Sequence, residues 1–141
     1  MRTRPRFHLA FPVHDLAVAR HFYGAILGCP EGRSDAHWVD FDLYGHQIVA
    51  HLAPEDVGHR STSSVDGHAV PARHFGLILA VPQWAELVQR LRDAKVTFII
   101  EPGVRFAGLP GEQHTCFLLD PSGNALEFKA FADESQIFAT V

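Results

Sequence analysis

The order of the predicted elements repeats once along the chain, and this internal duplication limits the folds that the sequence can adopt. A strand, a helix and two or three further strands are predicted over residues 6–52, and the same series is predicted over residues 74–131. The second series starts 66 residues after the first, counted from His8 to His74. Because helices and strands mix within each half, we predict an α+β fold made of two βαβββ modules.

In the first half, apolar and polar residues alternate over Arg6–Phe11, which indicates a strand. Asp15 suits the N-cap of a helix that runs to Leu27, because its side chain can accept a hydrogen bond from a free backbone N–H. Gly28 favours the end of that helix. Two further strands are predicted at His37–Leu43 and His46–Leu52, and Tyr44–Gly45 is the turn between them.

In the second half, Pro82 suits the first turn of a helix whose apolar residues recur at helical spacing. These apolar residues are Trp84, Leu87, Val88 and Leu91. The predicted elements are a strand His74–Val81, a helix Pro82–Ala94, a strand Val96–Ile100, a glycine-rich loop Gly103–Gly111, strands Gln113–Leu119 and Ala125–Phe131, and a short helix Asp133–Phe138.

The two halves are joined by residues 53–73, which are polar and rich in turn-forming residues. We predict a linker or a mobile loop over this stretch, and its length for a compact domain indicates that it is either functional or flexible. A chain of 141 residues has the usual size of one compact domain. We therefore predict a single domain, residues 1–141, built from modules of about 6–52 and 74–131.

The charge balance and the cysteines restrict the partners and the compartment. Twelve basic and 16 acidic residues give a net charge of −4 with neutral histidine, which does not favour nucleic-acid binding. No apolar run reaches the roughly 18 residues of a membrane span, and no signal-peptide core is present. Cys29 and Cys116 lack the spacing of a metal or disulfide motif. We expect two free thiols and a cytoplasmic protein.

Strand alternation places three potential metal ligands on comparable faces. His8 and His74 stand at equivalent positions of the two halves, each opposite a bulky apolar face, and Glu127 opposes the apolar Leu126 and Phe128. Two imidazoles and one carboxylate form the set that leaves open positions on an octahedral metal. The alternative is three unrelated polar residues that face solvent across a half-exposed sheet.

Three segments resemble the vicinal oxygen chelate superfamily, which includes glyoxalases, extradiol ring-cleavage dioxygenases and fosfomycin-thiol transferases. They are FHLAFPVHDLAVARHFYGAILG at residues 7–28, HFGLILAV at 74–81 and FLLDPSGNALEFKAF at 117–131. The resemblance covers nearly the whole chain and is greatest to small predicted extradiol-type dioxygenases. It implies sheets that curl into a cup around a metal, with His8, His74 and Glu127 as the ligands.

The resemblance also implies a reaction class. We expect a metal-dependent extradiol-type dioxygenase that acts on a small vicinal diol or catechol-like compound. Fe(II) is the first choice of metal, with Mn(II), Ni(II) and Zn(II) as alternatives, and a homodimer is expected. The alternative functions are a glyoxalase I-type lyase or isomerase, and a protein that binds a small ligand in the same cup. The transferase is disfavoured because the family's threonine is Ala10 here.

The number of protein ligands separates the two enzyme classes. Glyoxalase-type lyases usually take a fourth ligand from the last strand of the first half. When Gly45 is aligned with Gly123, Val49 falls opposite Glu127, and valine cannot bind a metal. Gln47 or His51 could fill the place if the register shifts. His51 has a second possible role, since extradiol enzymes carry an acid–base histidine on that strand.

Four side chains are candidates for the substrate pocket: Gln47, Thr115, Phe117 and Arg105. Phe117 departs from the extradiol pattern, in which this position commonly holds a tyrosine whose hydroxyl bonds the substrate. Its ring can still form a pocket wall. Asp120–Asn124 is predicted to be the turn that delivers Glu127, and Lys129 is expected to extend into water. Cys116 is expected to be an inert buried thiol.

Overall fold

The structure is a computed structural model that describes residues 4–58, 62–65 and 67–140. The strands of this part of the chain are β1 (His8–Val13), β2 (Glu31–Ser34), β3 (Trp38–Leu43), β4 (His46–Leu52), β5 (Thr62–Val65), β6 (His68–Pro71), β7 (His74–Ile78), β8 (Phe98–Arg105), β9 (Gln113–Leu119) and β10 (Ala125–Phe131). Its helices are α1 (Leu16–Ala19), a π-helix (Arg20–Ile26), α2 (Val81–Asp93) and two short 3₁₀ helices (Pro54–Asp56 and Glu134–Gln136).

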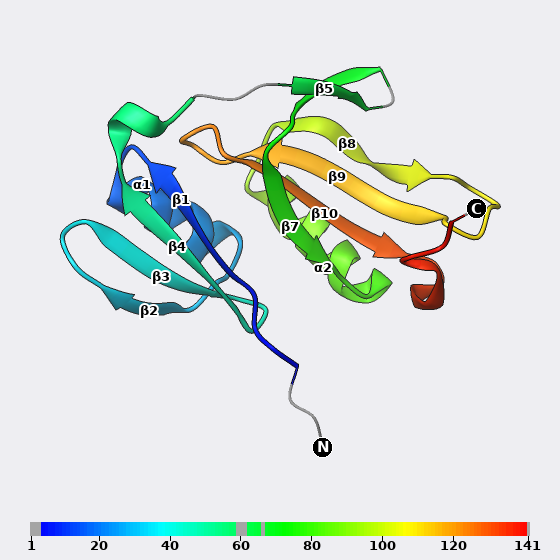
Figure 1. The fold of residues 1–141 in the computed structure, drawn as a ribbon, viewed down its shortest axis with the longest axis horizontal. Coiled ribbons are helices and arrows are strands. Elements are labelled where there is room, and N and C mark those ends of the chain that lie inside the picture. The colour runs from blue at the N-terminus through cyan, green and yellow to red at the C-terminus, as the bar shows by residue number, and fades with distance from the viewer. Residues whose placement is uncertain (1–3, 59–61, 66, 141) are drawn as a thin grey trace. The chain divides into compact units, whose positions relative to one another are not determined.

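Eight of the ten described strands form two four-stranded sheets with the same topology, and β5 and β6 pair with each other. The orders of the four-stranded sheets are β1-β4-β3-β2 and β7-β10-β9-β8, as Figure 1 shows. In each sheet the first and last strands of the module pair in parallel, and the last strand pairs antiparallel with its predecessor. The predicted α+β fold with two βαβββ modules is confirmed.

The chain divides into two compact units, and each is described by itself. Unit 1 comprises residues 1–59 with the loop Asp120–Asn124, and unit 2 comprises residues 60–119 and 125–141. The predicted modules, 6–52 and 74–131, each fall in one unit apart from that loop. A cup formed by both sheets together stays a prediction.

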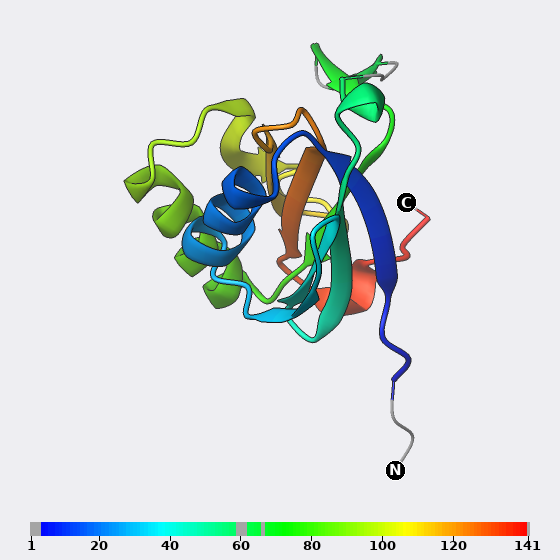
Figure 2. The ribbon, with the colours of Figure 1, turned by 90° about the vertical axis from the view of Figure 1, so that its left-hand side faces the viewer.

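The helix of unit 1 begins and ends where the sequence predicts. The Asp15 carboxylate accepts a hydrogen bond from the backbone N–H of Val18, and Gly28 follows the last turn with a φ of 75°. After one α-helical turn the segment continues as a π-helix, in which the Leu27 N–H bonds the Phe22 carbonyl at 2.9 Å. Figure 2 shows this helical segment along one side of its own sheet.

The loop Asp120–Asn124 is more than the predicted turn, because it is bonded to the rest of unit 1. The hydroxyl of the buried Tyr23 donates to Asp120 Oδ2 at 2.6 Å. The Asn124 side-chain amide donates to the Pro12 carbonyl at 2.7 Å and to the Asp120 carboxylate at 2.9 Å. Burial, followed by the Asp120 charge, raises the pKa of Tyr23 well above its usual value.

The core of unit 2 lies between α2 and its sheet. The apolar side chains predicted to share one face of this helix are all buried: Trp84, Leu87, Val88 and Leu91. They pack against β9 and β10, whose inward residues Cys116, Leu126 and Phe128 have no exposed surface. The Trp84 indole also donates to the Phe128 carbonyl at 2.9 Å, which ties the helix to β10.

Three predictions of local structure are corrected. Residues 53–73 join the modules, but β5 and β6 pair within this stretch as an antiparallel hairpin, and Val70 is buried with Phe117. Strand β8 extends to Arg105, so the first residues of the predicted glycine-rich loop belong to a strand. The sequence pattern also missed β2, an edge strand whose four residues are all exposed. Backbone pairing needs no apolar pattern, so the composition of these segments does not reveal it.

Candidate metal centre

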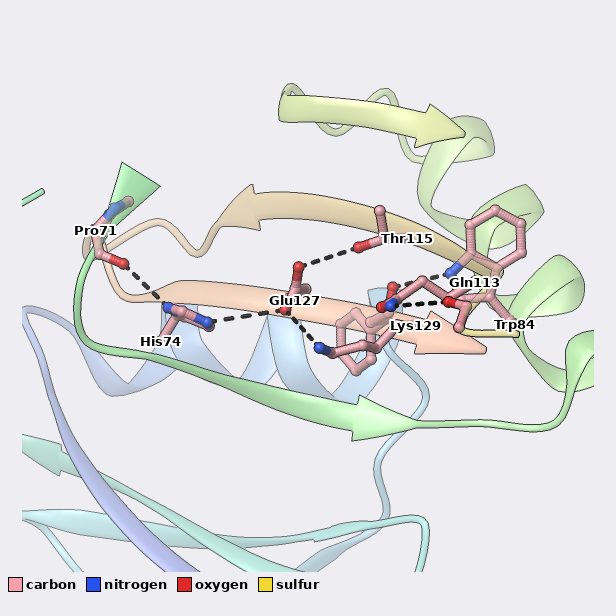
Figure 3. Close-up of polar contacts among 9 residues, drawn as sticks. Pro71, His74, Trp84, Gln113, Thr115, Glu127 and Lys129 are labelled. Atoms are coloured by element: carbon pink, nitrogen blue, oxygen red, sulfur yellow. Dashed lines mark hydrogen bonds and ion pairs between the residues drawn. The ribbon is translucent and has the colours of Figure 1, made fainter. Parts of the chain in front are cut away.

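Strands β7 and β10 bring two of the predicted ligands together in unit 2. The register pairs His74 with Ala125 and Gly76 with Glu127, so the two ligand positions are neighbours on parallel strands. His74 Nε2 lies 3.8 Å from Glu127 Oε1, and Figure 3 shows the two side chains pointing toward one another. Gly76 permits this approach, because a Cβ there would lie 2.6 Å from the backbone carbonyl carbon of Glu127.

The His74 ring is held with one particular nitrogen toward Glu127. Its Nδ1 lies 3.1 Å from the Pro71 carbonyl oxygen at the end of β6. A carbonyl can only accept, so Nδ1 carries the hydrogen and the neutral ring keeps its lone pair on Nε2. The Phe117 ring packs edge-on against the imidazole at a centroid distance of 4.8 Å. Both contacts fix the ring with its free lone pair beside the carboxylate.

The two oxygens of the Glu127 carboxylate have different partners, as Figure 3 shows. The hydroxyl of the buried Thr115 donates to Oε2 at 3.1 Å. The Lys129 ammonium lies 3.6 Å from Oε1, the oxygen that also faces His74. Lys129 was expected to extend into water; it forms an ion pair with Glu127 instead. Thr115 therefore orients the Glu127 carboxylate, and Oε1 faces the side chains of His74 and Lys129.

In unit 1, His8 is held in the same tautomeric form. Its Nδ1 lies 2.7 Å from Gln47 Oε1, and Gln47 Nε2 donates to Asp40 Oδ2 at 3.2 Å. The Asp40 carboxylate can only accept, so the NH2 group of the Gln47 amide must face it. The Gln47 amide oxygen therefore faces His8 and accepts the hydrogen on Nδ1. The Nε2 lone pair of neutral His8 is thus available, as it is in His74. Gln47, predicted as a pocket residue, orients His8.

The parallel registers of the two sheets identify the equivalent positions. In unit 2, Glu127 on β10 pairs with Gly76, which lies two residues after His74. In unit 1, Val49 on β4 pairs with Ala10, which lies two residues after His8. Val49 is therefore the equivalent of Glu127. The sequence alignment that set Val49 against Glu127 therefore agrees with the pairing of the strands. By the same register, His51 is the equivalent of Lys129, and it is exposed near the end of β4.

The predicted site residues are divided between the units. Unit 2 brings together four of them: His74, Thr115, Phe117 and Glu127. Arg105 ends β8 opposite Gln113, and its guanidinium carbon lies 4.8 Å from the centroid of the Phe106 ring. Gln47 and His51 share a sheet face with His8 in unit 1. Over residues 4–58, 62–65 and 67–140, no three His, Cys, Asp or Glu side chains form a group able to hold a metal ion.

A family comparison assigns this fold. The model of the Glyoxalase/Bleomycin resistance protein/Dioxygenase superfamily matches residues 7–128. The chain belongs to this superfamily. The family resemblance predicted from the three sequence segments is thereby confirmed. A comparison with curated proteins gives no match.

Solved structures from the superfamily and from related proteins share the fold. A glyoxalase/bleomycin resistance protein/dioxygenase from Alicyclobacillus acidocaldarius is 33% identical with a TM-score of 0.79, over 98% of this chain and 100% of that chain. The fosfomycin resistance protein of Listeria monocytogenes is 17% identical, with a TM-score of 0.71, over 96% and 100%. Lactoylglutathione lyase from Agrobacterium tumefaciens is 17% identical, with a TM-score of 0.65, over 92% and 96%. The last two likenesses show the fold alone.

Proteins of this superfamily typically bind a divalent metal, and the donors of unit 2 fit one. An imidazole nitrogen with a free lone pair and a carboxylate oxygen suit a first-row divalent ion. Each donor also has the outer partner that metal sites use, a backbone carbonyl for His74 and a hydroxyl for Glu127. Cys116 supplies no ligand, because it lies between Thr115 and Phe117 on β9 and faces the buried, helix-covered side of the sheet. Among the described residues, no helix is long and apolar enough to cross a membrane.

Proposed function

We propose that this protein is a metal-dependent extradiol-type dioxygenase that acts on a small vicinal-diol or catechol-like substrate. His8, His74 and Glu127 are the proposed ligands, and Fe(II) is the proposed metal. One observation carries the proposal. Both histidines donate Nδ1–H to a fixed oxygen acceptor and keep Nε2 free, which is how metal-binding histidines are oriented.

The position of Val49 supports a site with three protein ligands. It is the strand equivalent of Glu127 and offers no donor atom. The amide oxygen of Gln47 is already bonded to His8, which leaves it the role of orienting that ring. An Fe(II) ion with three protein ligands keeps positions for the two oxygens of a vicinal diol and for dioxygen, and this is the chemistry that the metal supplies when bound.

The remaining residues have roles around the substrate. His51 is the proposed acid–base residue that takes a proton from a diol hydroxyl and returns it later. In the strand register His51 is the equivalent of Lys129, whose ammonium lies 3.6 Å from Glu127 Oε1. The ring of Phe117 forms a wall beside His74, and Thr115 holds the carboxylate in place.

One observation favours a second candidate, a glyoxalase-type lyase. Phe117 offers no hydroxyl beside His74, so the site lacks the hydrogen bond that extradiol enzymes commonly give to the substrate. A lyase would use Ni(II), Zn(II) or Mn(II) and would need no oxygen. A protein that only binds a small ligand would bind the metal and the ligand without turnover.

Metal content tests the ligand set. We expect about one divalent ion per chain in the wild type and a large loss in His8→Ala, His74→Ala and Glu127→Gln, because each of these side chains would supply one bond to the ion. His21→Ala is the control, since His21 is an exposed histidine of the π-helix. Elemental analysis after purification without chelators is the measurement. Unchanged metal content in all three ligand variants would remove the basis of the proposal.

Oxygen consumption separates the reactions. The Fe(II)-loaded protein should consume oxygen with a catecholic substrate, and His51→Ala should lower kcat more than it raises KM. Anaerobic conversion of the thiol adduct of a 2-oxoaldehyde with Ni(II) or Zn(II), without oxygen uptake on any catechol, would establish the lyase instead. Binding of catechols without either reaction would leave the ligand-binding protein.

We also propose a cytoplasmic location, which the two buried free cysteines support. We further propose a homodimer, because two-module members of this superfamily often pair. Sedimentation velocity measures the dimer. The third ligand can come from the same chain or from the partner. Mixing His8→Ala with Glu127→Ala protein restores metal sites after subunit exchange only if the partner supplies His8.

A further inference from the structure

We propose that Lys129 binds an anionic group of the substrate, so that the substrate is a vicinal diol that also carries a carboxylate. This inference rests on the proposed function, because it concerns the same metal site. It begins from the placement of Lys129, whose ammonium lies 3.6 Å from Glu127 Oε1. The same oxygen faces His74 Nε2 at 3.8 Å, so the ammonium is paired with an oxygen that a metal ion would need as a ligand.

The surroundings of Lys129 allow its side chain to move. Its neighbours across the sheet are Ile78 on β7 and Thr115 on β9, and neither is charged. Among the residues described, Glu127 is the one carboxylate that pairs with Lys129. About a third of the Lys129 side chain is exposed, at 32%, so its flexible stem can swing without opening the core.

A divalent ion on Glu127 Oε1 would disturb this ion pair. The ion and the ammonium carry like charges and would compete for one oxygen at a separation where their repulsion is strong. Lys129 would then leave Oε1, and the described part of the sheet offers it no second carboxylate. A substrate anion placed beside the metal would satisfy the ammonium. The lysine that covers Oε1 before loading is therefore positioned to bind the substrate afterwards.

A purely structural role accounts less well for Lys129. A partly exposed ion pair contributes little to stability, roughly 0–1 kcal/mol. Lys95 and Lys129 are the only lysines in the chain, and its other ten cationic residues are arginines. Lysine suits a mobile contact with an anion, because its ammonium is a compact charge on a flexible stem.

The first experiment compares ligand binding by Lys129→Met with wild type, both loaded with Zn(II). The probes are catechol and 3,4-dihydroxybenzoate, which differ by one carboxylate. We expect Lys129→Met to bind the carboxylated probe roughly tenfold more weakly, the scale of a lost charged hydrogen bond, and catechol with unchanged affinity. Lys95→Met is the matched control, because Lys95 is the other lysine of the chain and is exposed just after α2, which ends at Asp93.

The affinity for Zn(II) is measured in a second titration, without the two probes. Lys129→Met should bind Zn(II) roughly tenfold more tightly than wild type, because the competing positive charge is gone. Reductive methylation with ¹³C gives one signal for each of the two lysines. On addition of Zn(II) the Lys129 signal should shift and the Lys95 signal should not, and 3,4-dihydroxybenzoate should shift Lys129 again.

The outcomes distinguish the inference from the proposed function. If Zn(II) binds and the ratio of the two probe affinities is the same in Lys129→Met as in wild type, the inference is overturned and the proposed function stands. If Zn(II) binds neither protein, the proposed function fails, and the inference fails with it. A loss of carboxylate preference confined to Lys129→Met supports the inference.

Discussion

Gly76 is the residue whose enlargement tests the site geometry most directly. It faces Glu127 across the parallel pair of β7 and β10. A Cβ at this position would lie 2.6 Å from the Glu127 carbonyl carbon and would overlap the carbonyl oxygen. Backbone atoms cannot rotate out of the way as a side chain does. Gly76→Ala must therefore push the two strands apart.

The size of the effect follows from this overlap. Ordinary contact requires a retreat of about 1 Å or more, which stretches neighbouring interstrand hydrogen bonds beyond their working length. The strands pair over five register positions. We expect Gly76→Ala to lower the free energy of unfolding by about 3 kcal/mol, a large share of the stability of a domain. It should also weaken metal binding, because His74 moves away from Glu127.

Ala10 provides the matched control, since it occupies in unit 1 the register position that Gly76 occupies in unit 2. The first sheet accommodates a Cβ there, so the requirement for glycine is specific to β7. Ala10→Gly should cost about 1 kcal/mol or less. Urea denaturation followed by circular dichroism gives the stabilities, and a Zn(II) titration gives the affinities. Gly76→Ala with the denaturation midpoint and metal affinity of wild type would refute this account.

Three further predictions concern groups fixed by the structure. Thr115→Val should weaken Zn(II) binding about tenfold in a chelator competition, because Glu127 loses the hydroxyl that orients it. Tyr23→Phe should lower the free energy of unfolding by about 2 kcal/mol in urea, through loss of the hydrogen bond to Asp120. The raised pKa of Tyr23 means that the folded state keeps its proton to higher pH than the unfolded state; wild-type stability should therefore fall as pH rises above about 10, and less steeply in Tyr23→Phe. Cys116, whose thiol pKa is about 12, should resist thiol reagents at pH 8 until the protein is unfolded, as a colorimetric thiol assay would show.

Much of the site was accessible from the sequence because strand alternation is a local property. The period of two placed His8, His74 and Glu127 opposite apolar faces, and the repeated element order related the two halves. The pattern also set Val49 against Glu127, in agreement with the parallel registers. The helix of unit 2 and its buried face followed from helical spacing in the same way.

The contacts that orient these side chains could not be read from the same patterns. The carbonyl that fixes His74 belongs to Pro71, in a segment whose composition predicted a linker or a mobile loop. The ion pair of Lys129 with Glu127 was missed because alternation gives the face of a side chain but not the direction in which a long stem turns.

The sequence by itself therefore determined the duplicated modules, the strand faces and the candidate ligands, since these depend on the spacing of neighbouring residues. Only the tertiary structure decided which ring nitrogen of each histidine is free and which oxygen of Glu127 is covered. It also joined Asp120–Asn124 to Tyr23 and Pro12, more than 90 residues away in the chain. The physical reason is that a hydrogen bond depends on where distant segments return, and local periodicity carries no information about that path.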